Sequence, residues 1–238
     1  MRDEYVGDVG DFGKYLLLNE LRDIAGREIK IGINWYYNTR PATAFRYLSD
    51  NNSPQFKKIN ETLFAHLGNL YASRQPRLSE IEDQKIVKGC LCYREPIPYS
   101  YPRNVREGHR KQWFDESLIA LNDAKIIFLD PDNGIPPDTV TMSDIDAVKY
   151  AFIDEIYGYY KSKSVILYQH ENRITGFRGR FLDEIHKIKP FKDPLVIRCP
   201  RYMARNYALI AKTEKHREVF ENLFIRLVTD YPFMFEPG

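Results

Sequence analysis

Apolar residues recur along the chain at two spacings, and each spacing predicts one kind of element. In 11–25 they recur every three to four positions, which predicts a helix that Asp11 caps and Gly26 ends. From Ile29 every second residue is apolar, which predicts a strand within 29–37. A second helix is expected downstream of Pro41, a residue suited to a first helical position. Its apolar positions are Phe56, Ile59, Leu63, Leu67 and Leu70.

The rest of the chain alternates between short apolar runs and helical spacing. Further strands are predicted at 85–92, 125–129, 164–169, 194–198 and 206–212. Helices are predicted between most of them, including one that a capping box of Ser143 and Asp146 opens. Strands that alternate with helices favour a parallel sheet covered on both faces. The last two strands are separated by seven residues, too few for a crossover helix, so we expect them to pair antiparallel.

These elements predict a Rossmann-like α/β fold, with a mainly parallel sheet, a C-terminal antiparallel strand pair and helices on both faces. No repeat, low-complexity tract or linker divides residues 1–238, so a single domain is expected. Apolar residues make up 43% of the chain, which is enough for a packed core. The 35 Lys and Arg against 33 Asp and Glu leave a net charge of +2, which does not by itself demand a polyanionic partner.

Two further patterns bear on where the protein works. The apolar runs are strand-sized, well below the length of a membrane span, and the start of the chain lacks the basic-then-apolar pattern of a secretion signal. Cys90, Cys92 and Cys199 are odd in number and lack CxxC spacing, so they are interpreted as reduced thiols. A cytoplasmic protein with no membrane partner is expected.

Polar residues follow three of the predicted strands. IKIGI runs into Asn34, KIIFL into Asp-Pro-Asp-Asn-Gly (130–134), and SVILYQ into His-Glu-Asn-Arg (170–173). The carboxyl ends of parallel strands share one edge of the sheet, where open α/β sheets bind ligands. The residues of 130–134 also favour a tight turn. A turn explains Asn133 and Gly134, but it explains the carboxylates at 130 and 132 less well. The candidate catalytic residues are Asp130, Asp132, Asn133 and His170.

The segment YVGDVGDFGKY (5–15) is the other dense group of polar and glycine residues. Three glycines and two aspartates precede the first helix, with Lys14 in its first turn. Glycine allows a backbone to approach a ligand closely, and the amides of a helix N-terminus favour anions. An ordinary capped helix start explains the same residues, and the segment matches neither a P-loop nor a dinucleotide-binding fingerprint.

These two segments together resemble a known enzyme family. YVGDVGDFGKYLLL is similar to the N-terminal motif of large-subunit ribosomal RNA adenine methyltransferases, in which Gly, Asn or Asp, Asp and Lys precede a leucine-rich helix at this spacing. Those enzymes place Asp-Pro-Pro-Tyr after a later strand, where this chain has Asp-Pro-Asp-Asn (130–133). The whole chain also resembles a bacterial family of uncharacterised function that carries both motifs. The resemblance implies a class I methyltransferase-like fold. The matching residues are Gly7, Asp8, Asp11 and Lys14.

Two departures separate the chain from that family. Asp132 and Asn133 replace the second proline and the aromatic residue that stacks on a flipped base in amino-methylating enzymes. IGINWYYN (31–38) lacks the glycine-rich turn that holds S-adenosylmethionine after the first strand. Either the cofactor is held differently, or the fold serves another purpose.

The stretch YREPIPYSYPRNVREGHRK (93–111) is a candidate lid or nucleic-acid contact. Tyrosines alternate there with Arg and Lys, and aromatic rings can stack on bases while cations meet phosphates. A solvated, irregular loop explains the composition equally well. The candidate substrate-binding residues are Arg106, Arg110, Glu171 and Arg173.

Three functions follow from these observations. The first is an S-adenosylmethionine-dependent, methyltransferase-like enzyme acting on a nucleic acid or nucleotide. In it Asp130, supported by Asn133, would orient the substrate amine or accept its proton, and His170 would border the substrate. The residues implied for the cofactor are Gly7, Asp8, Asp11, Lys14 and Asn34.

The second function is a metal-dependent nuclease or phosphoesterase. Asp130, Asp132 and Glu171 would supply the oxygen ligands that Mg²⁺ or Mn²⁺ prefers, and His170 would orient water. The third is a non-catalytic nucleotide-binding protein on an inherited enzyme fold, because a fold does not determine a function.

Overall fold

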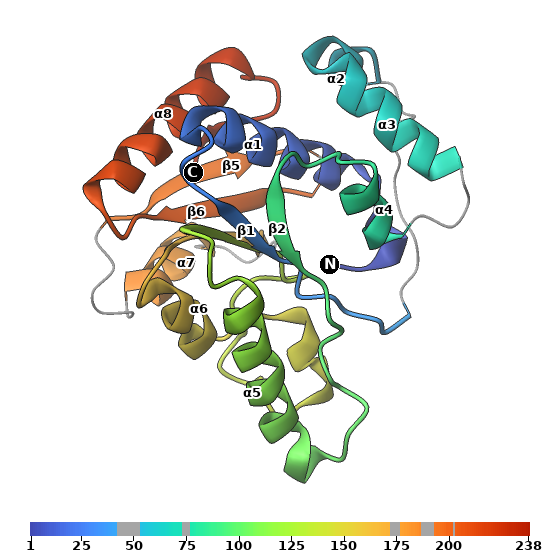
Figure 1. The fold of residues 1–238 in the computed structure, drawn as a ribbon, viewed down its shortest axis with the longest axis vertical. Coiled ribbons are helices and arrows are strands. Elements are labelled where there is room, and N and C mark those ends of the chain that lie inside the picture. The colour runs from blue at the N-terminus through green and yellow to red at the C-terminus, as the bar shows by residue number, and fades with distance from the viewer. Residues whose placement is uncertain (42–52, 73–76, 172–176, 187–192, 202) are drawn as a thin grey trace.

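The computed structural model describes residues 1–41, 53–72, 77–171, 177–186, 193–201 and 203–238. Within them, seven strands form one mixed sheet in the order β2-β1-β3-β4-β6-β5-β7 (Figure 1). The strands are β1 Ile31–Asn34, β2 Cys90–Tyr93, β3 Ile126–Leu129, β4 Ser164–His170, β5 Leu195–Cys199, β6 Arg205–Ile210 and β7 Glu236–Pro237. This is the predicted Rossmann-like α/β fold.

Strand direction divides the sheet into two parts. β2, β1, β3 and β4 are parallel, whereas β6 lies antiparallel between β4 and β5. The antiparallel pairing of the last two predicted strands is therefore confirmed, and its cause is the short connection between them. Residue Leu209 pairs with Ile166 on one side and Leu195 on the other, so β6 is hydrogen-bonded along both edges.

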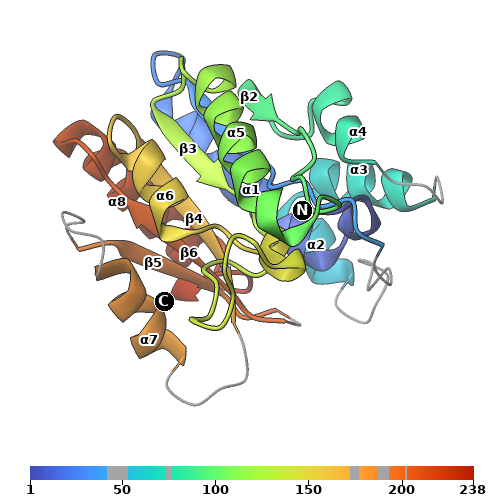
Figure 2. The same ribbon diagram turned by 90° about the horizontal axis from the view of Figure 1, so that it is seen from below.

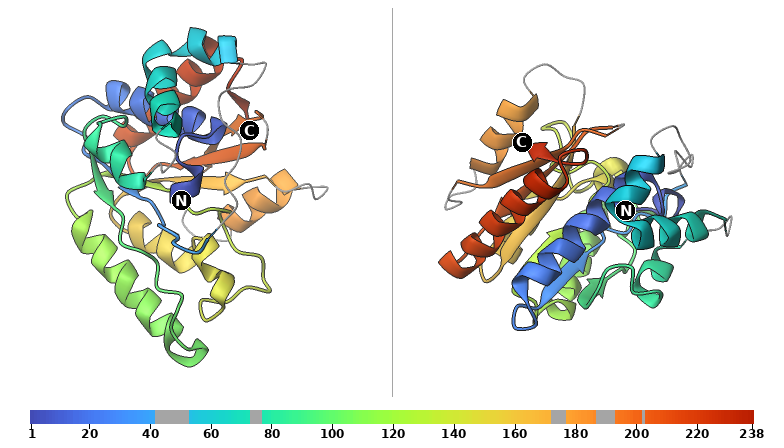
Figure 3. Two further views of the ribbon diagram at one scale, coloured as in Figure 1. Left: turned by 90° about the vertical axis from the view of Figure 1, so that its right-hand side faces the viewer. Right: turned by 90° about the horizontal axis from the view of Figure 1, so that it is seen from above.

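Helices cover both faces of the sheet. One face carries α1 Val9–Ala25, α2 Ser53–Ile59, α3 Glu61–Ala72, α4 Leu78–Asp83 and α8 Glu214–Asp230. The other carries α5 Arg103–Ala120, α6 Ile153–Tyr160 and α7 Phe177–His186 (Figure 2). α1 and α8 lie side by side above the central strands (Figure 3). The apolar run of β3 serves both faces, because Phe128 packs on the α1 side and Ile127 on the α5 side.

Several predicted boundaries were wrong, each for a local reason. α1 begins three residues earlier than expected, because Asp8 and not Asp11 is the cap that accepts a hydrogen bond from the Asp11 amide. The helix expected through Phe56 and Leu70 is divided at Asn60, whose side chain accepts a hydrogen bond from the Leu63 amide and caps α3. Its expected beginning, 42–52, lies outside the described residues.

Two further elements are shorter than predicted. The helix expected from Ser143 is a 3-10 helix, Ile145–Lys149, followed by a separate α6. The strand expected at 85–92 begins only at Cys90, because Lys85 and Gly89 both have positive φ and form turns. Cys90, Cys92 and Cys199 are free thiols, as predicted. In the part of the chain described here, no helix has the length and apolar character that crossing a membrane requires.

Candidate functional site

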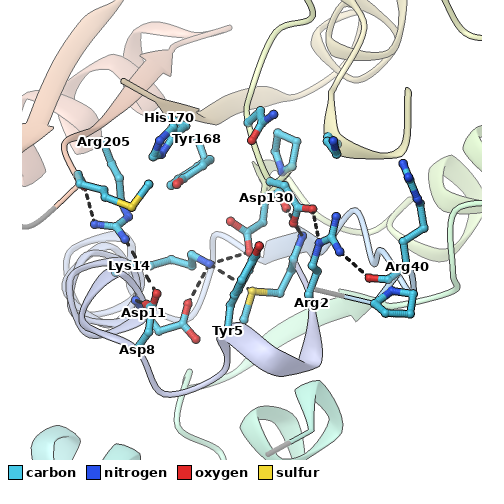
Figure 4. A pocket seen from close by; sticks show the side chains of 18 residues that line it. Arg2, Tyr5, Asp8, Asp11, Lys14, Arg40, Asp130, Tyr168, His170 and Arg205 are labelled. Atoms are coloured by element: carbon cyan, nitrogen blue, oxygen red, sulfur yellow. Dashed lines mark hydrogen bonds and ion pairs between the residues drawn. The ribbon is translucent and has the colours of Figure 1, made fainter. Parts of the chain in front are cut away.

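A pocket of about 640 Å³ lies where the carboxyl ends of β3 and β4 meet the beginning of α1 (Figure 4). Parallel pairing in register brings the ends of β1, β3 and β4 to this edge, as predicted. The acidic residues lining the pocket are Asp8, Asp11, Asp130 and Asp132. The cationic residues lining it are Arg2, Lys14, Arg40, Lys149 and Arg205.

Lys14 joins the two sequence motifs at the floor of this pocket. Its Nζ lies 3.0 Å from Asp11 Oδ1 and 2.7 Å from Asp130 Oδ2 (Figure 4). Asp11 and Lys14 are three residues apart on α1 and so share one helix face. Asp130 follows β3, and the amide of Asp130 donates to the Asn34 carbonyl, which fixes its backbone to the sheet. Residues 116 positions apart thus form one buried ion cluster.

Burial and charge act in opposite directions on this cluster. Burial by itself lowers the pKa of Lys14, but Asp11 and Asp130 together raise it above its ordinary value. Burial raises the pKa of Asp11 and of Asp130, and Lys14 offsets only part of this effect because two carboxylates share one ammonium. Tyr15 donates a further hydrogen bond of 2.9 Å to Asp11 Oδ2. The cluster therefore holds Asp130 firmly and keeps Lys14 protonated.

Asp132 forms a second buried cluster beside the first. Its Oδ2 accepts hydrogen bonds of 2.7 Å from both Arg2 Nε and Asn38 Nδ2, and its Oδ1 lies 3.0 Å from the Met1 amino group. Although burial alone raises the pKa of Asp132, the Met1 amino group and Arg2 lower it overall. Asp132 is thus an anion held by cations of the chain itself. The Met1 amino group also donates to the carbonyls of Trp35 and Tyr36, in the turn after β1.

The turn at 130–134 is braced by β4. Gln169 Nε2 donates to the Asn133 carbonyl, and Gln169 Oε1 accepts from the Ile135 amide. Gly134 has a φ of +99°, and a Cβ there would lie 2.2 Å from Gln169 Oε1. Only glycine fits this position, so the turn interpretation of Gly134 is correct. Asn133 also lines the pocket, and its backbone stabilises the turn by donating to the Lys149 carbonyl and accepting from the His170 amide.

His170 and Tyr168 of β4 and Arg205 of β6 form another wall of the pocket. His170 ends β4 and is half-buried, and burial together with Arg205 lowers its pKa, which favours the neutral imidazole. Burial raises the pKa of the Tyr168 phenol to about 12. Arg205 begins β6, and because β6 is antiparallel, its first residue reaches the same edge as the last residue of β4.

Several predicted site residues lie elsewhere. Asn34 is fully buried and braces the turn after β1, where its Oδ1 accepts from the Tyr36 amide and its Nδ2 donates to Tyr159. The amide of Gly7 donates to Asp11, but Gly7 itself does not line the pocket. Glu171 pairs with Arg198 of β5 at 2.7 Å. Arg173 lies outside the described residues.

The stretch 93–111 is only in part the irregular loop that was considered. Its second half is the beginning of α5, and only 94–102 is irregular. Arg110 is 1% exposed and pairs with Glu155 at 2.6 Å, while Arg106 donates to the backbone carbonyls of Tyr99, Tyr101 and Ser143. Neither arginine lines the pocket, because both attach α5 to neighbouring segments.

Of the residues proposed as metal ligands, Asp130 and Asp132 line the pocket and Glu171 does not. Asp130 pairs with Lys14 and Asp132 with Arg2, whereas Glu171 faces Arg198. Across the described residues, no group of three or more His, Cys, Asp or Glu side chains is arranged to hold a metal ion.

Some pocket residues had no predicted role. They are Met1, Arg2, Tyr5, Gly10, Arg40, Pro41, Lys149, Tyr168, Met203 and Arg205. Arg205 could have been found, since a strand predicted to run antiparallel must begin at the edge where the parallel strands end. Arg2, Arg40 and Lys149 reach the pocket from chain segments that carry no motif.

No family model matches the chain, and no curated protein is significantly similar to it in sequence.

Proposed function

We propose that the protein is a cytoplasmic, S-adenosylmethionine-dependent, methyltransferase-like enzyme acting on a nucleic acid or nucleotide. One observation carries the proposal: Lys14 of the N-terminal motif lies 2.7 Å from Asp130 of the Asp-Pro motif. These are the two motifs that resemble ribosomal RNA adenine methyltransferases, and they meet in one pocket at the ligand-binding edge of an α/β sheet.

The pocket fits a cofactor that carries both charges and an aromatic base. Its volume of about 640 Å³ is in the range of small-molecule sites, and both acidic and cationic side chains line it. The turn after β1 is closed, because Met1 bonds to its carbonyls and Tyr36 is fully buried. The cofactor would therefore be held by Asp8 and the first turn of α1 rather than by a glycine-rich loop after β1. When bound, S-adenosylmethionine would supply an electrophilic methyl group.

Two residues of the chain would act on the substrate. The carboxylate of Asp130, fixed by Lys14, would accept a hydrogen bond from the substrate nitrogen and orient its lone pair. As a bond to carbon forms, that nitrogen loses a proton, and the neutral imidazole of His170 would accept it. Asp130 is the poorer base of the two, because Lys14 already donates a hydrogen bond to it.

Aromatic and cationic residues at the pocket offer contacts for a nucleotide. Tyr5 and Tyr168 line the pocket and supply the rings that Asp-Pro-Asp-Asn lacks. Arg40 and Lys149, which also line it, pair with Asp146 at 2.7 and 2.8 Å. Asp146 is half exposed, so these cations can exchange it for a phosphate without losing a buried partner.

The proposal is tested by calorimetry with S-adenosylmethionine and S-adenosylhomocysteine, followed by transfer of a labelled methyl group to RNA, DNA and nucleotides. We expect one-to-one binding, and loss of transfer by about 10²-fold in His170→Asn or Asp130→Asn. Lys111→Ala is the matched control, since Lys111 lies on α5 and forms an exposed pair with Glu107. Binding of Mg²⁺ or Mn²⁺ that Asp132→Asn removes, with no binding of either adenosyl compound, would favour the phosphoesterase instead.

A further inference from the structure

Arg205 is a buried cation whose hydrogen bonds are incomplete. It is 9% exposed, and its Nη1 donates to the carbonyls of Arg201 and Met203. Within the described part of the chain, its Nε and Nη2 donate no hydrogen bond, and Nη2 lies 3.9 Å from Asp8 Oδ2, too far for one. Burying a guanidinium is costly unless its donors find acceptors. The remaining donors lie at the wall of the pocket (Figure 4).

Asp8 is the complementary group. Its Oδ1 accepts the capping hydrogen bond of 2.8 Å from the Asp11 amide, and among the described residues Oδ2 makes only the long contact to Arg205. The Asp8 side chain is 18% exposed at the pocket. A carboxylate oxygen and a guanidinium nitrogen therefore stand side by side, each with unused hydrogen-bonding capacity.

Gly10 places the guanidinium there. A Cβ at Gly10 would lie 2.2 Å from Arg205 Nη2 and 2.4 Å from its Cζ, so the guanidinium packs directly on the α1 backbone. Gly10 is the second residue of α1 and lies in its first turn. The space that glycine leaves is filled by the Arg205 side chain.

We infer that Asp8 and Arg205 form a subsite for the α-amino-acid head group of a ligand, with Arg205 binding its carboxylate and Asp8 its ammonium. A ligand that carries only phosphate would meet the like charge of Asp8, and one that carries only an amine would meet Arg205. A zwitterion whose ammonium and carboxylate are attached to one carbon satisfies both. The inference rests on the proposed function, in which the ligand is S-adenosylmethionine and the head group is its methionine part.

The test compares two probes by calorimetry. S-adenosylhomocysteine carries the amino-acid head group, and 5′-methylthioadenosine has the same thioadenosine without it. The variants are Arg205→Gln, Asp8→Asn, which keeps a capping side chain, and Gly10→Ala, which displaces the guanidinium but keeps its charge. Lys111→Ala is the control.

We expect each of the three variants to bind S-adenosylhomocysteine about tenfold or more weakly, with affinity for 5′-methylthioadenosine changed less than about twofold. Equal losses for both probes, or unchanged affinity for S-adenosylhomocysteine, would overturn the subsite and leave the proposed function standing. If the unaltered protein bound neither probe, both proposals would fail together. Gly10→Ala and Asp8→Asn keep the test decisive even if Arg205→Gln does not fold.

Discussion

Lys14 is the residue on which the buried charges of the pocket depend most. It is 5% exposed and is the cation shared by Asp11 and Asp130. A buried ion pair contributes little relative to an apolar replacement of both partners, but removing one partner leaves an uncompensated charge. Removing Lys14 would leave two buried carboxylates, Asp11 and Asp130, without their cation.

Replacing Lys14 with methionine should therefore destabilise the fold by about 3–5 kcal/mol. Asp130→Asn should cost less, because Lys14 keeps Asp11 at 3.0 Å. Urea unfolding at pH 7.5 measures both. Lys30→Met, which removes an exposed pair with Asp123, is the control and should cause no measurable loss. Equal stability of Lys14→Met and the control would show that the cluster is solvated rather than buried.

Two histidines should make the fold less stable in mild acid. Burial lowers the pKa of His170 and of His216 below 6.5, with Arg205 adding to the effect at His170 and Lys215 at His216. The unfolded chain therefore binds protons more readily than the folded one as the pH falls through 6.5. The stability that the two histidines contribute to the fold is complete above that pH and is lost progressively below it.

We expect the melting temperature to fall between pH 7.5 and pH 5.5, and to fall less in His170→Asn and in His216→Asn. Thermal unfolding of the three proteins at both pH values measures this. An unchanged pH dependence in both variants would assign the acid sensitivity to other groups.

At the scale of elements, the beginning of α1 matters most for the site. Asp8 has extended backbone, and its side chain accepts a hydrogen bond from the Asp11 amide, as an N-cap does. This cap sets where the helix begins and so brings Asp11 and Lys14 to face Asp130. The same carboxylate lies beside the Arg205 guanidinium at the pocket. The cap therefore links the local stability of α1 to the geometry of the pocket.

Asp8→Ala should lower the free energy of unfolding by about 1 kcal/mol, whereas Asp8→Asn should change it by only a few tenths, because asparagine caps as well as aspartate. Chemical unfolding of the two variants distinguishes them. A large loss in both would mean that the ion pair with Arg205, and not the cap, stabilises this end of α1.

At the scale of the whole molecule, Arg110 connects α5 to the segment that contains α6. It pairs with Glu155 through Nε and Nη2 and donates to the carbonyls of Ala147 and Tyr150. Glu155 also accepts from Tyr36 in the turn after β1. This network joins two helices and a strand end under one face of the sheet.

Arg110→Met should therefore cost about 3–5 kcal/mol, since it leaves Glu155 buried without its cation. Lys111→Met changes the next residue of the same helix, whose pair with Glu107 is exposed, and should cause no measurable loss. Denaturation curves of the two variants provide the comparison. If both variants lost little stability, Arg110 would not be a structural residue, and its predicted role in substrate binding would be favoured again.

The fold class and the edge of the sheet where the pocket lies could both be predicted from the sequence alone. Apolar runs such as IIFL must be buried on both faces, which requires a covered parallel sheet, and the short connection before β6 requires an antiparallel pairing. Strand direction then places Asp130 and His170 at one edge whatever the side-chain details. Turn residues such as Gly134 could also be predicted, because the positive φ that such a turn requires is a local property of the backbone.

The pairing of the charged residues could not be predicted, because it depends on how the elements pack. Lys14 could have paired with Asp11 alone, and Arg110 could have faced solvent, because spacing along the chain does not specify a partner in a distant part of the sequence. Arg205 belongs to the pocket only because β6 runs antiparallel and because Gly10 leaves room for its guanidinium. Ion pairing depends on distance in space and on burial, and both are set when the elements pack together.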